Sequence, residues 1–377
     1  KEWFYLLAFF IINVGAAYSI IKYKERKYIL AFLLFLYMVV FMFLNVNFTK
    51  FTLFVILPSL VAGLGLGLLD ESSKKDELWD CEFGTSKGKR FVRNVKRGIL
   101  IFGSAGSGKT ESPIYVLLKH FAEQDFTGII YDYKDGELSE IAKGLFGDKL
   151  KVIAIHKPYI GLRINPLDER YIKDEKDINE IVQVIIDNLS GTGKPDFFQE
   201  NATALLTSII LKFHLDHREY CTLPHIISFI LACDFSEVTG ETNSLGAEAV
   251  ETFSKLKSFL LSNKRVQIQA SAFLMGLASE RQTAAVLSTL ANALRKLAYP
   301  EAFYVLSGND VNLDVNDPEV DTVITLLNEP TADSFLTPIL ACIIHTTTKQ
   351  MMVRHRKQSF VLLDEAPTIN LRNMAKL

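Results

Sequence analysis

The sequence predicts an α/β protein that begins with transmembrane helices and is interrupted by a large all-α insertion. Three observations predict this fold class. Residues 1–70 are almost continuously apolar, residues 98–167 and 301–377 alternate short apolar runs with helical stretches, and residues 168–300 show helical spacing alone. We therefore divide the chain into an anchor (1–70), a polar linker (71–97), the first half of an α/β domain, an inserted all-α domain, and the second half of the α/β domain.

The anchor contains three long apolar segments, at residues 3–21, 28–44 and 51–69. Each is long enough, or nearly so, to cross a hydrocarbon core about 30 Å thick. Aromatic residues gather near the segment ends, where interfacial anchors are expected. A cleaved signal peptide would supply one such segment, and three uncharged core helices in succession are improbable. We expect three transmembrane helices.

The connectors between these segments predict their orientation. Residues 22–27 carry four basic residues and one acidic residue, which the positive-inside rule places in the cytoplasm. Residues 45–50 then form the outer loop, and the chain after Asp70 returns to the cytoplasm. Since the chain starts without methionine, we expect a missing upstream piece to supply a further crossing. The protein is expected in the plasma membrane, multi-pass, with its large domain cytoplasmic.

Composition excludes some classes of function. The 41 basic and 43 acidic residues nearly balance, so no global basic field indicates nucleic-acid binding. The four cysteines show no metal-binding or redox spacing, and the seven histidines form no ligand cluster.

The α/β parts predict a parallel sheet. Strands are expected at residues 99–102, 128–132, 152–155, 322–327 and 359–363. Helices are expected at 112–121, 178–189, 197–217, 224–232, 247–261, 282–297 and 338–354.

A glycine-rich loop follows the first predicted strand. Residues 103–110 read Gly-Ser-Ala-Gly-Ser-Gly-Lys-Thr and fit the phosphate-binding pattern G-x-x-x-x-G-K-[ST]. Glycines let successive backbone N–H groups point at the same phosphates, and the helix N-terminus favours their charge. Lys109 would reach the β- and γ-phosphates, and Thr110 would hold Mg²⁺. The predicted nucleotide-binding residues are Gly103, Ser104, Ala105, Gly106, Ser107, Gly108, Lys109, Thr110 and Glu111.

The second half of such a site is predicted near the C-terminus. The apolar run 359–363 ends in Asp364 and Glu365. In enzymes with this loop, the first acid holds Mg²⁺ through water and a following glutamate can activate the attacking water. We therefore expect Thr110 and Asp364 at the metal, Lys109 and Glu365 in catalysis, and ATP with Mg²⁺ as the ligands. The acidic pair favours an ATP-hydrolysing motor over a small GTPase. Asp132 lies at the end of another predicted strand. Two roles are equally compatible with this position, one near Mg²⁺ and one as the cap of the following helix.

Four segments resemble those of a known family, the membrane-anchored coupling proteins of type IV secretion and conjugation, of the TraG/TraD type. Residues 131–138 resemble its Asp-Pro-Lys-Gly-Glu-Leu segment, although Tyr133 replaces proline and Asp135 is extra. Residues 164–167 resemble its Asn-Pro-Leu segment, residues 195–202 the opening of its all-α domain, and residues 363–368 its second acidic motif. The sequences before and after the glycine-rich loop are most similar to those of mobilisation proteins of the Bacteroidetes type.

The resemblance implies a hexameric RecA-like ATPase at the bacterial inner membrane. Such a protein receives a relaxase bound to single-stranded DNA and feeds it to a type IV secretion channel. ATP then lies between subunits, where a neighbour's arginine stabilises the transition state. That arginine and the last strands of the sheet are expected after Asp364, so we expect the sheet to be truncated and the fragment to hydrolyse ATP poorly.

The sequence leaves two other functions possible. One is another membrane-bound DNA translocase or secretion-system ATPase. The other is a nucleotide-gated membrane scaffold that binds a protein substrate without pumping DNA. The large all-α insertion argues against a chromosome-segregation translocase.

Overall fold

A computed structural model describes residues 78–104, 106–190, 197–232, 255–276 and 280–371, together with Ile11, Val14, Leu57 and Val61. The three predicted membrane segments therefore lie outside the described residues, apart from those four positions. Within the described part of the chain, no helix is both long enough and apolar enough to cross a bilayer. The chain divides into two compact units, residues 1–99 and 100–377.

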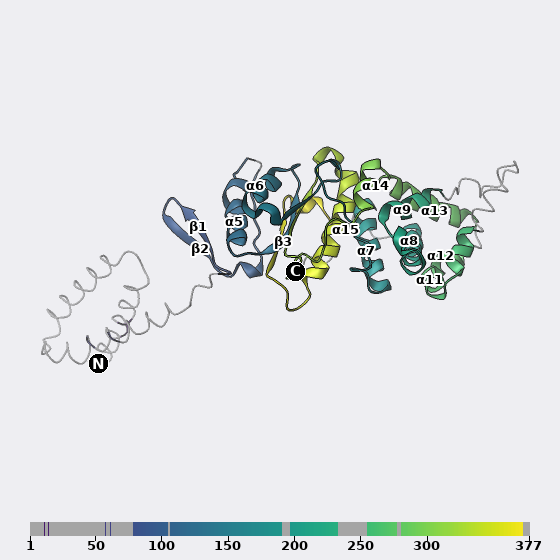
Figure 1. The fold of residues 1–377 in the computed structure, drawn as a ribbon, viewed down its shortest axis with the longest axis horizontal. Coiled ribbons are helices and arrows are strands. Elements are labelled where there is room, and N and C mark those ends of the chain that lie inside the picture. Colours follow the sequence, from purple (N-terminus) through teal and green to yellow (C-terminus); the bar gives the residue numbers. More distant parts are fainter. Residues whose placement is uncertain are drawn as a thin grey trace, which may run out of the picture. The chain divides into compact units, whose positions relative to one another are not determined.

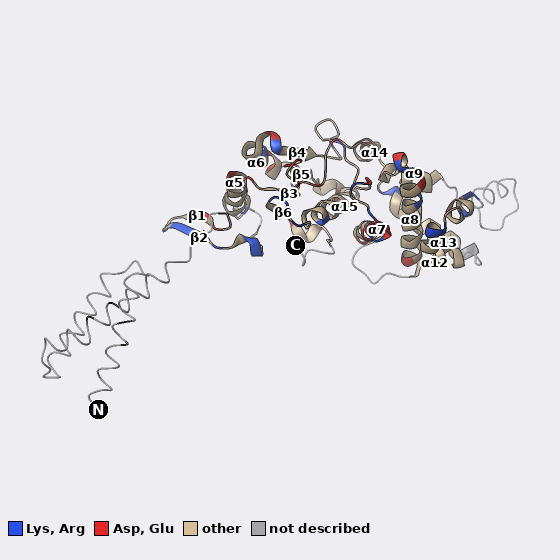
Figure 2. Ribbon diagram, turned by 60° about the horizontal axis from the view of Figure 1, so that its bottom comes forward, with Lys and Arg blue, Asp and Glu red and all other residues tan. Residues whose placement is uncertain are grey.

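The described residues of the first unit include a β-hairpin. Strand β1 (Cys81–Thr85) pairs antiparallel with β2 (Gly88–Val92), and Gly88 closes the turn with a positive φ of 102°. Figure 2 shows basic residues in blue on β2, which is exposed along its whole length. The stretch expected to be a linker at residues 71–97 thus contains regular structure.

The second unit, whose strand β3 is labelled in Figure 1, contains a parallel sheet of four strands in the order β4-β5-β3-β6. Figure 2 labels all four strands. These are β3 (Thr127–Asp132), β4 (Leu150–Ile153), β5 (Val323–Leu327) and β6 (Ser359–Leu363). Four of the five predicted strands are therefore confirmed, with shifts of at most two residues at their ends. β3 and β5 are buried along their whole lengths, as expected of strands covered on both faces.

Alternate residues of β6 face two different layers. Phe360 stacks on Phe121 at 4.7 Å and on Phe146 at 5.9 Å between ring centroids. Those two rings come from helices α5 (Tyr115–Glu123) and α6 (Glu137–Phe146). Val361 and Leu363 instead pack against the large core on the opposite face. Helix α15 (Asp333–Met351) contributes to that core, so the sheet has helices on both sides.

The predicted buried strand at residues 99–102 is wrong. These residues form no strand pairing, and Leu100 and Phe102 are 76% and 85% exposed. An apolar run becomes a buried strand only when it pairs with a neighbouring strand and is covered by other elements. Among the described strands, β6 pairs with β3 alone, so residues 99–102 do not extend the sheet beyond β6.

The all-α region lies between β4 and β5 in the sequence, as predicted. Its helices are α7 (Glu175–Ser190), α8 (Phe197–Asp216), α9 (Leu223–Ala232), α11 (Lys264–Gln269), α12 (Ser271–Gly276) and α13 (Glu280–Arg295). Helix α14 (Pro300–Leu306) follows and was not predicted. Most of the helix predicted at 247–261 lies outside the described residues.

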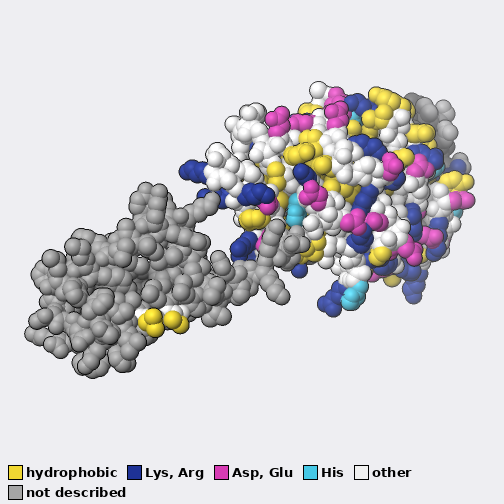
Figure 3. All heavy atoms as spheres, turned by 60° about the vertical axis from the view of Figure 1, so that its left-hand side comes forward, with side chains coloured by type: hydrophobic (Ala, Val, Ile, Leu, Met, Phe, Trp, Pro, Cys, Tyr) yellow, Lys and Arg dark blue, Asp and Glu magenta, His cyan; other side chains and the backbone are white. Residues whose placement is uncertain are grey.

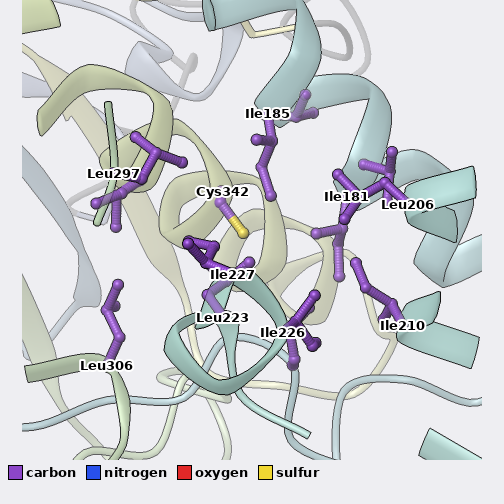
Figure 4. Close-up of a cluster of buried hydrophobic side chains, with 14 of the residues drawn as sticks. Ile181, Ile185, Leu206, Ile210, Leu223, Ile226, Ile227, Leu297, Leu306 and Cys342 are labelled. Carbon is purple, nitrogen blue, oxygen red and sulfur yellow. The ribbon is translucent and has the colours of Figure 1, made fainter. Parts of the chain in front are cut away.

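A continuous apolar core joins the all-α region to the sheet (Figure 4). Cys342 of α15 lies in the same cluster as Ile185 of α7 and Leu223 of α9. Burial raises the pKa of the Cys342 thiol to about 12, as expected of an inert core cysteine. The all-α region and the parallel sheet therefore share one apolar core.

Four charged residues tie together the N-terminal ends of the strands. Lys149, before β4, pairs with Asp125 at 2.8 Å and with Asp321 at 2.6 Å. Lys357, before β6, pairs with the same two carboxylates at 2.5 and 2.9 Å. Because Asp125 precedes β3 and Asp321 precedes β5, this network contacts every strand of the sheet. We call it the strand-end network.

Candidate nucleotide-binding site

The glycine-rich loop leads into helix α5. Gly106 and Gly108 have positive φ values of 73° and 78°, which a glycine adopts without the steric cost of a Cβ. A Cβ at Gly103 would collide with Ser107 Oγ. Ser107 N donates to Ser104 O at 3.2 Å, which closes a turn of the loop. Gly106 and Gly108 therefore occupy backbone conformations that favour glycine.

The helix after the loop starts with a wide turn, Thr110–Ile114, in which Ile114 N donates to Lys109 O at 3.1 Å, five residues back. Pro113 explains this turn, since proline has no N–H to make the ordinary bond to that carbonyl. Regular helix begins at Tyr115, three residues later than predicted. Thr110 is 7% exposed, at the start of the wide turn.

The parallel register brings the acidic residues to the carboxyl edge of the sheet. Tyr131 pairs with Leu363, and Asp364 N donates to Tyr131 O at 3.0 Å. Asp132, the last residue of β3, and Asp364, the first residue after β6, therefore lie at the same edge of the sheet. Ligands of open α/β sheets bind outside this edge.

Lys109 and Glu365 meet although they come from opposite ends of the α/β domain. Lys109 Nζ lies 3.8 Å from Glu365 Oε1 and donates to Gly103 O at 2.7 Å. The lysine side chain is 19% exposed and the glutamate side chain 40%. The structure thus brings together the two residues that the motifs predicted for catalysis.

Asp364 is a buried carboxylate among other acids. Burial raises the pKa of Asp364 above its usual range, and Lys134 acts in the opposite direction. The neighbouring carboxylates of Glu365, Asp132 and Glu137 raise it further. Within the described part of the chain, no hydrogen bond to the Asp364 side chain is seen.

These residues fit a magnesium ion. The donor set is a hydroxyl (Thr110) and a carboxylate (Asp364), and hard oxygen ligands are those that Mg²⁺ prefers. A divalent cation would also relieve the repulsion around Asp364. Mg²⁺ in such sites keeps waters and substrate phosphates as ligands, so few protein ligands are needed. Among the described residues, no cluster of three or more His, Cys, Asp or Glu able to hold a metal is found.

Asp132 caps a helix. Its Oδ2 accepts from Ser139 N at 2.8 Å and from Ser139 Oγ at 2.7 Å, and its Oδ1 accepts from Lys134 N at 3.2 Å. Of the two roles left open by the sequence, these bonds favour capping, because they occupy both oxygens of a fully buried side chain.

Sequence reasoning gave no role to Lys134. Its side chain pairs with Glu137 at 3.2 Å and lies close enough to Asp364 to lower the pKa of that carboxyl. The signal available was its position directly after β3, at the same sheet edge as the acidic pair. Ala105 of the loop lies outside the described residues.

On the face seen in Figure 3, basic and acidic side chains are interspersed over the described residues. This agrees with the nearly balanced composition. The surface seen there carries no extended field of one sign that would indicate a nucleic-acid groove.

Comparisons with known sequences give two results. A family model described as type IV secretory system conjugative DNA transfer matches residues 69–373 of the chain. A comparison with curated protein sequences gives no match.

Several solved structures share the fold. The bacterial conjugative coupling protein TrwBdeltaN70, in complex with sulphate, is 15% identical with a TM-score of 0.51, over 73% of this chain and 57% of that one. The plasmid coupling protein TrwB with the non-hydrolysable ATP analogue ADPNP is 14% identical with a TM-score of 0.51, over 73% and 58%. TrwB with the GTP analogue GDPNP is 16% identical with a TM-score of 0.50, over 73% and 58%. The chain thus spans less than three fifths of these structures.

Proposed function

Since the chain belongs to the family of type IV secretory system conjugative DNA transfer proteins, we propose that it is the ATPase of a coupling protein. In this proposal it delivers a relaxase bound to single-stranded DNA to a type IV secretion channel. The observation that carries the ATPase is the approach of Lys109 to Glu365 beside the phosphate loop. TrwB, which shares the fold, binds the ATP analogue ADPNP, and this supports ATP as the nucleotide.

We assign the binding roles to residues of the loop. The backbone amides of residues 103–111 surround the phosphates, and Lys109 moves from Gly103 O and Glu365 to the β- and γ-phosphates. Thr110 and Asp364 would hold Mg²⁺, which neutralises charge on the phosphates when bound.

Glu365 is the proposed general base. It accepts a proton from the attacking water as the water oxygen bonds to the γ-phosphorus and the bond from that phosphorus to the β–γ bridging oxygen breaks. Its exposed carboxylate can reach water, whereas the carboxylate of Asp364 is buried and is assigned to the cation.

The anchor and the assembly complete the proposal. Residues 1–70 would hold the protein in the inner membrane as a multi-pass anchor, with the ATPase domain cytoplasmic. The active form would be a homo-hexamer that places ATP between subunits, with a neighbour's arginine at each site. The alternative is a related DNA translocase or secretion ATPase, or a nucleotide-gated scaffold.

Replacing Lys109 tests the proposal. Lys109→Ala removes a charge-assisted phosphate contact of about 1.5–3 kcal/mol, which corresponds to roughly a 10- to 150-fold weaker nucleotide affinity. We expect this loss in a titration with a fluorescent ATP analogue, together with loss of DNA transfer from donor cells that carry only the variant. Lys119→Ala, on the exposed face of α5, is the control. Unchanged transfer with Lys109→Ala would contradict the coupling role.

A further inference from the structure

The loop that carries Glu365 is held in an uncommon conformation. We call residues 364–371, which follow β6, the Glu365 loop. Glu365 has a positive φ of 46°, which is rare for a residue with a Cβ. A short turn, Ala366–Thr368, follows, and Ile369 is then buried. A strained residue persists only when its surroundings fix it. The position of the Glu365 carboxylate therefore depends on what holds this loop.

One holding contact comes from the sheet. Thr368 Oγ1 donates to Glu365 O at 2.8 Å, and Tyr131 Oη lies 3.2 Å from Thr368 Oγ1. Asn328 Nδ2 donates to Tyr131 Oη at 2.7 Å. Each group in this chain of hydrogen bonds therefore donates to the next. The Asn328 amide donates to the Tyr131 hydroxyl, which donates to the Thr368 hydroxyl, which donates to the Glu365 carbonyl. This chain fixes the near end of the loop to the end of β3.

The other holding contact comes from the all-α region. Asn188, in the last turn of α7, donates from Nδ2 to Asn370 O at 2.9 Å and accepts from Asn370 N at 3.0 Å. A single side chain thus makes both hydrogen bonds that a neighbouring strand would make. Only the backbone of Asn370 takes part. We call this pair of bonds the Asn188 clamp.

Helix α7 is firmly packed at the other end of this contact. Ile181, Val184 and Ile185 are at most 3% exposed, and Lys349 of α15 pairs with Asp177 of α7 at 2.6 Å. A displacement of α7 would therefore move the helix as a unit and would carry the Asn188 clamp with it. The clamp is the direct hydrogen-bonded link from the all-α region to the Glu365 loop among the described residues.

We propose that Asn188 is a positioning residue that couples the all-α region to the hydrolytic site. Through the clamp, a substrate docked on the helices shifts the Glu365 loop and so changes the rate of ATP hydrolysis. This inference rests on the proposed function, because it takes Glu365 as the base and the translocated complex as the substrate. The inference adds to the proposed function a specific contact through which substrate binding on the helices changes the position of Glu365.

The test compares two asparagines in the full-length protein. Asn188→Ala breaks the clamp, whereas Asn370→Ala keeps it, since the clamp uses only the backbone of residue 370. Asn179→Ala, on the exposed face of α7, controls for the effect of alanine on the helix. For each variant we would measure nucleotide affinity, turnover with and without single-stranded DNA, and hydrogen exchange of residues 364–371.

We expect Asn188→Ala alone to speed exchange in residues 364–371 and to lower turnover about tenfold or more, because small misplacements of a catalytic group are costly. The ratio of turnover with single-stranded DNA to turnover without it should fall towards one, while nucleotide affinity stays unchanged. If Asn188→Ala shows the same hydrogen exchange in residues 364–371 and the same DNA stimulation as Asn179→Ala, the inference is overturned. If the wild-type protein binds no nucleotide, the proposed function fails instead, and exchange in residues 364–371 still decides whether Asn188 holds the loop.

Discussion

At the scale of single residues, the ionisation of Asp364 is set by its neighbours. Its carboxyl is buried and faces three other acids, so its pKa is raised. A group whose pKa is higher in the folded state favours folding below its unfolded pKa, and this contribution is lost as pH rises through the folded pKa. Above its folded pKa, the charged Asp364 therefore destabilises the metal-free fold.

Asp364→Asn should remove this repulsion. We expect the variant to melt at a higher temperature than the wild type near pH 7 in the presence of EDTA, with the difference shrinking below about pH 4. Adding Mg²⁺ with ATP should stabilise the wild type and leave the variant nearly unchanged. Thermal melts across pH, with and without Mg²⁺ and ATP, check both parts. A variant that melts lower in EDTA and still gains from Mg²⁺ would remove Asp364 from the metal site.

Residue identities at the site were predictable, and residue contacts were less so. The phosphate-loop pattern and the Asp-Glu pair name Lys109, Thr110, Asp364 and Glu365, because each pattern corresponds to one chemistry. The role of Asp132 could not be decided, because it depends on where Ser139 N lies after the chain has folded. The Asn188 clamp has no sequence pattern at all, since it joins a side chain to a backbone far along the chain.

At the scale of elements, the strand-end network holds the sheet by charge. Hydrogen bonds from Lys149 and Lys357 lower the pKa of Asp125. Burial acts to raise the pKa of Asp321, but hydrogen bonds from the same lysines bring it below its ordinary value. A lowered carboxyl pKa means that the stabilisation is present above the unfolded pKa and is lost as pH falls through the folded pKa.

Asp321→Asn isolates that charge effect. Asp321 has a positive φ of 41°, which asparagine also tolerates, so the backbone should be unchanged. We expect a loss of about 0.5–1 kcal/mol of unfolding free energy at pH 7, because the network is partly exposed. The loss should shrink as the pH falls and vanish once the carboxyl is protonated in both states. Urea melts at pH 7 and at low pH measure this, with the exposed Asp148→Asn as control. An equal loss at both would exclude an ionic origin.

Elements with a strong periodic pattern were predicted better than those that depend on a distant partner. The four strands of the parallel sheet and the long helices α7, α8 and α13 follow from the apolar runs and the helical spacing of the sequence. Residues 99–102 have the same apolar character as a buried strand, but an apolar run does not encode which strand will lie beside it. The hairpin β1–β2 was missed because both faces of β2 are exposed, so its sequence lacks the usual alternation.

At the scale of the whole molecule, the proposed membrane anchor and the proposed ring are linked. Three apolar segments in residues 1–70 would confine the subunits to the membrane plane, where they meet at higher effective concentration. Deleting residues 1–70 should therefore yield a soluble and largely monomeric domain. Light scattering coupled to size-exclusion chromatography measures the mass directly. An unchanged hexamer after the deletion would show that the anchor does not assemble the ring.

The central claim is that ATP hydrolysis is coupled to single-stranded DNA. The most direct measurement is ATP turnover by the full-length protein in detergent, with and without single-stranded DNA, beside its Glu365→Gln variant. We predict turnover that rises with DNA and disappears in the variant, while the variant still binds and traps ATP, because the amide cannot accept the proton of the attacking water. Turnover that does not respond to DNA would contradict the DNA motor and favour protein export or a nucleotide-gated scaffold.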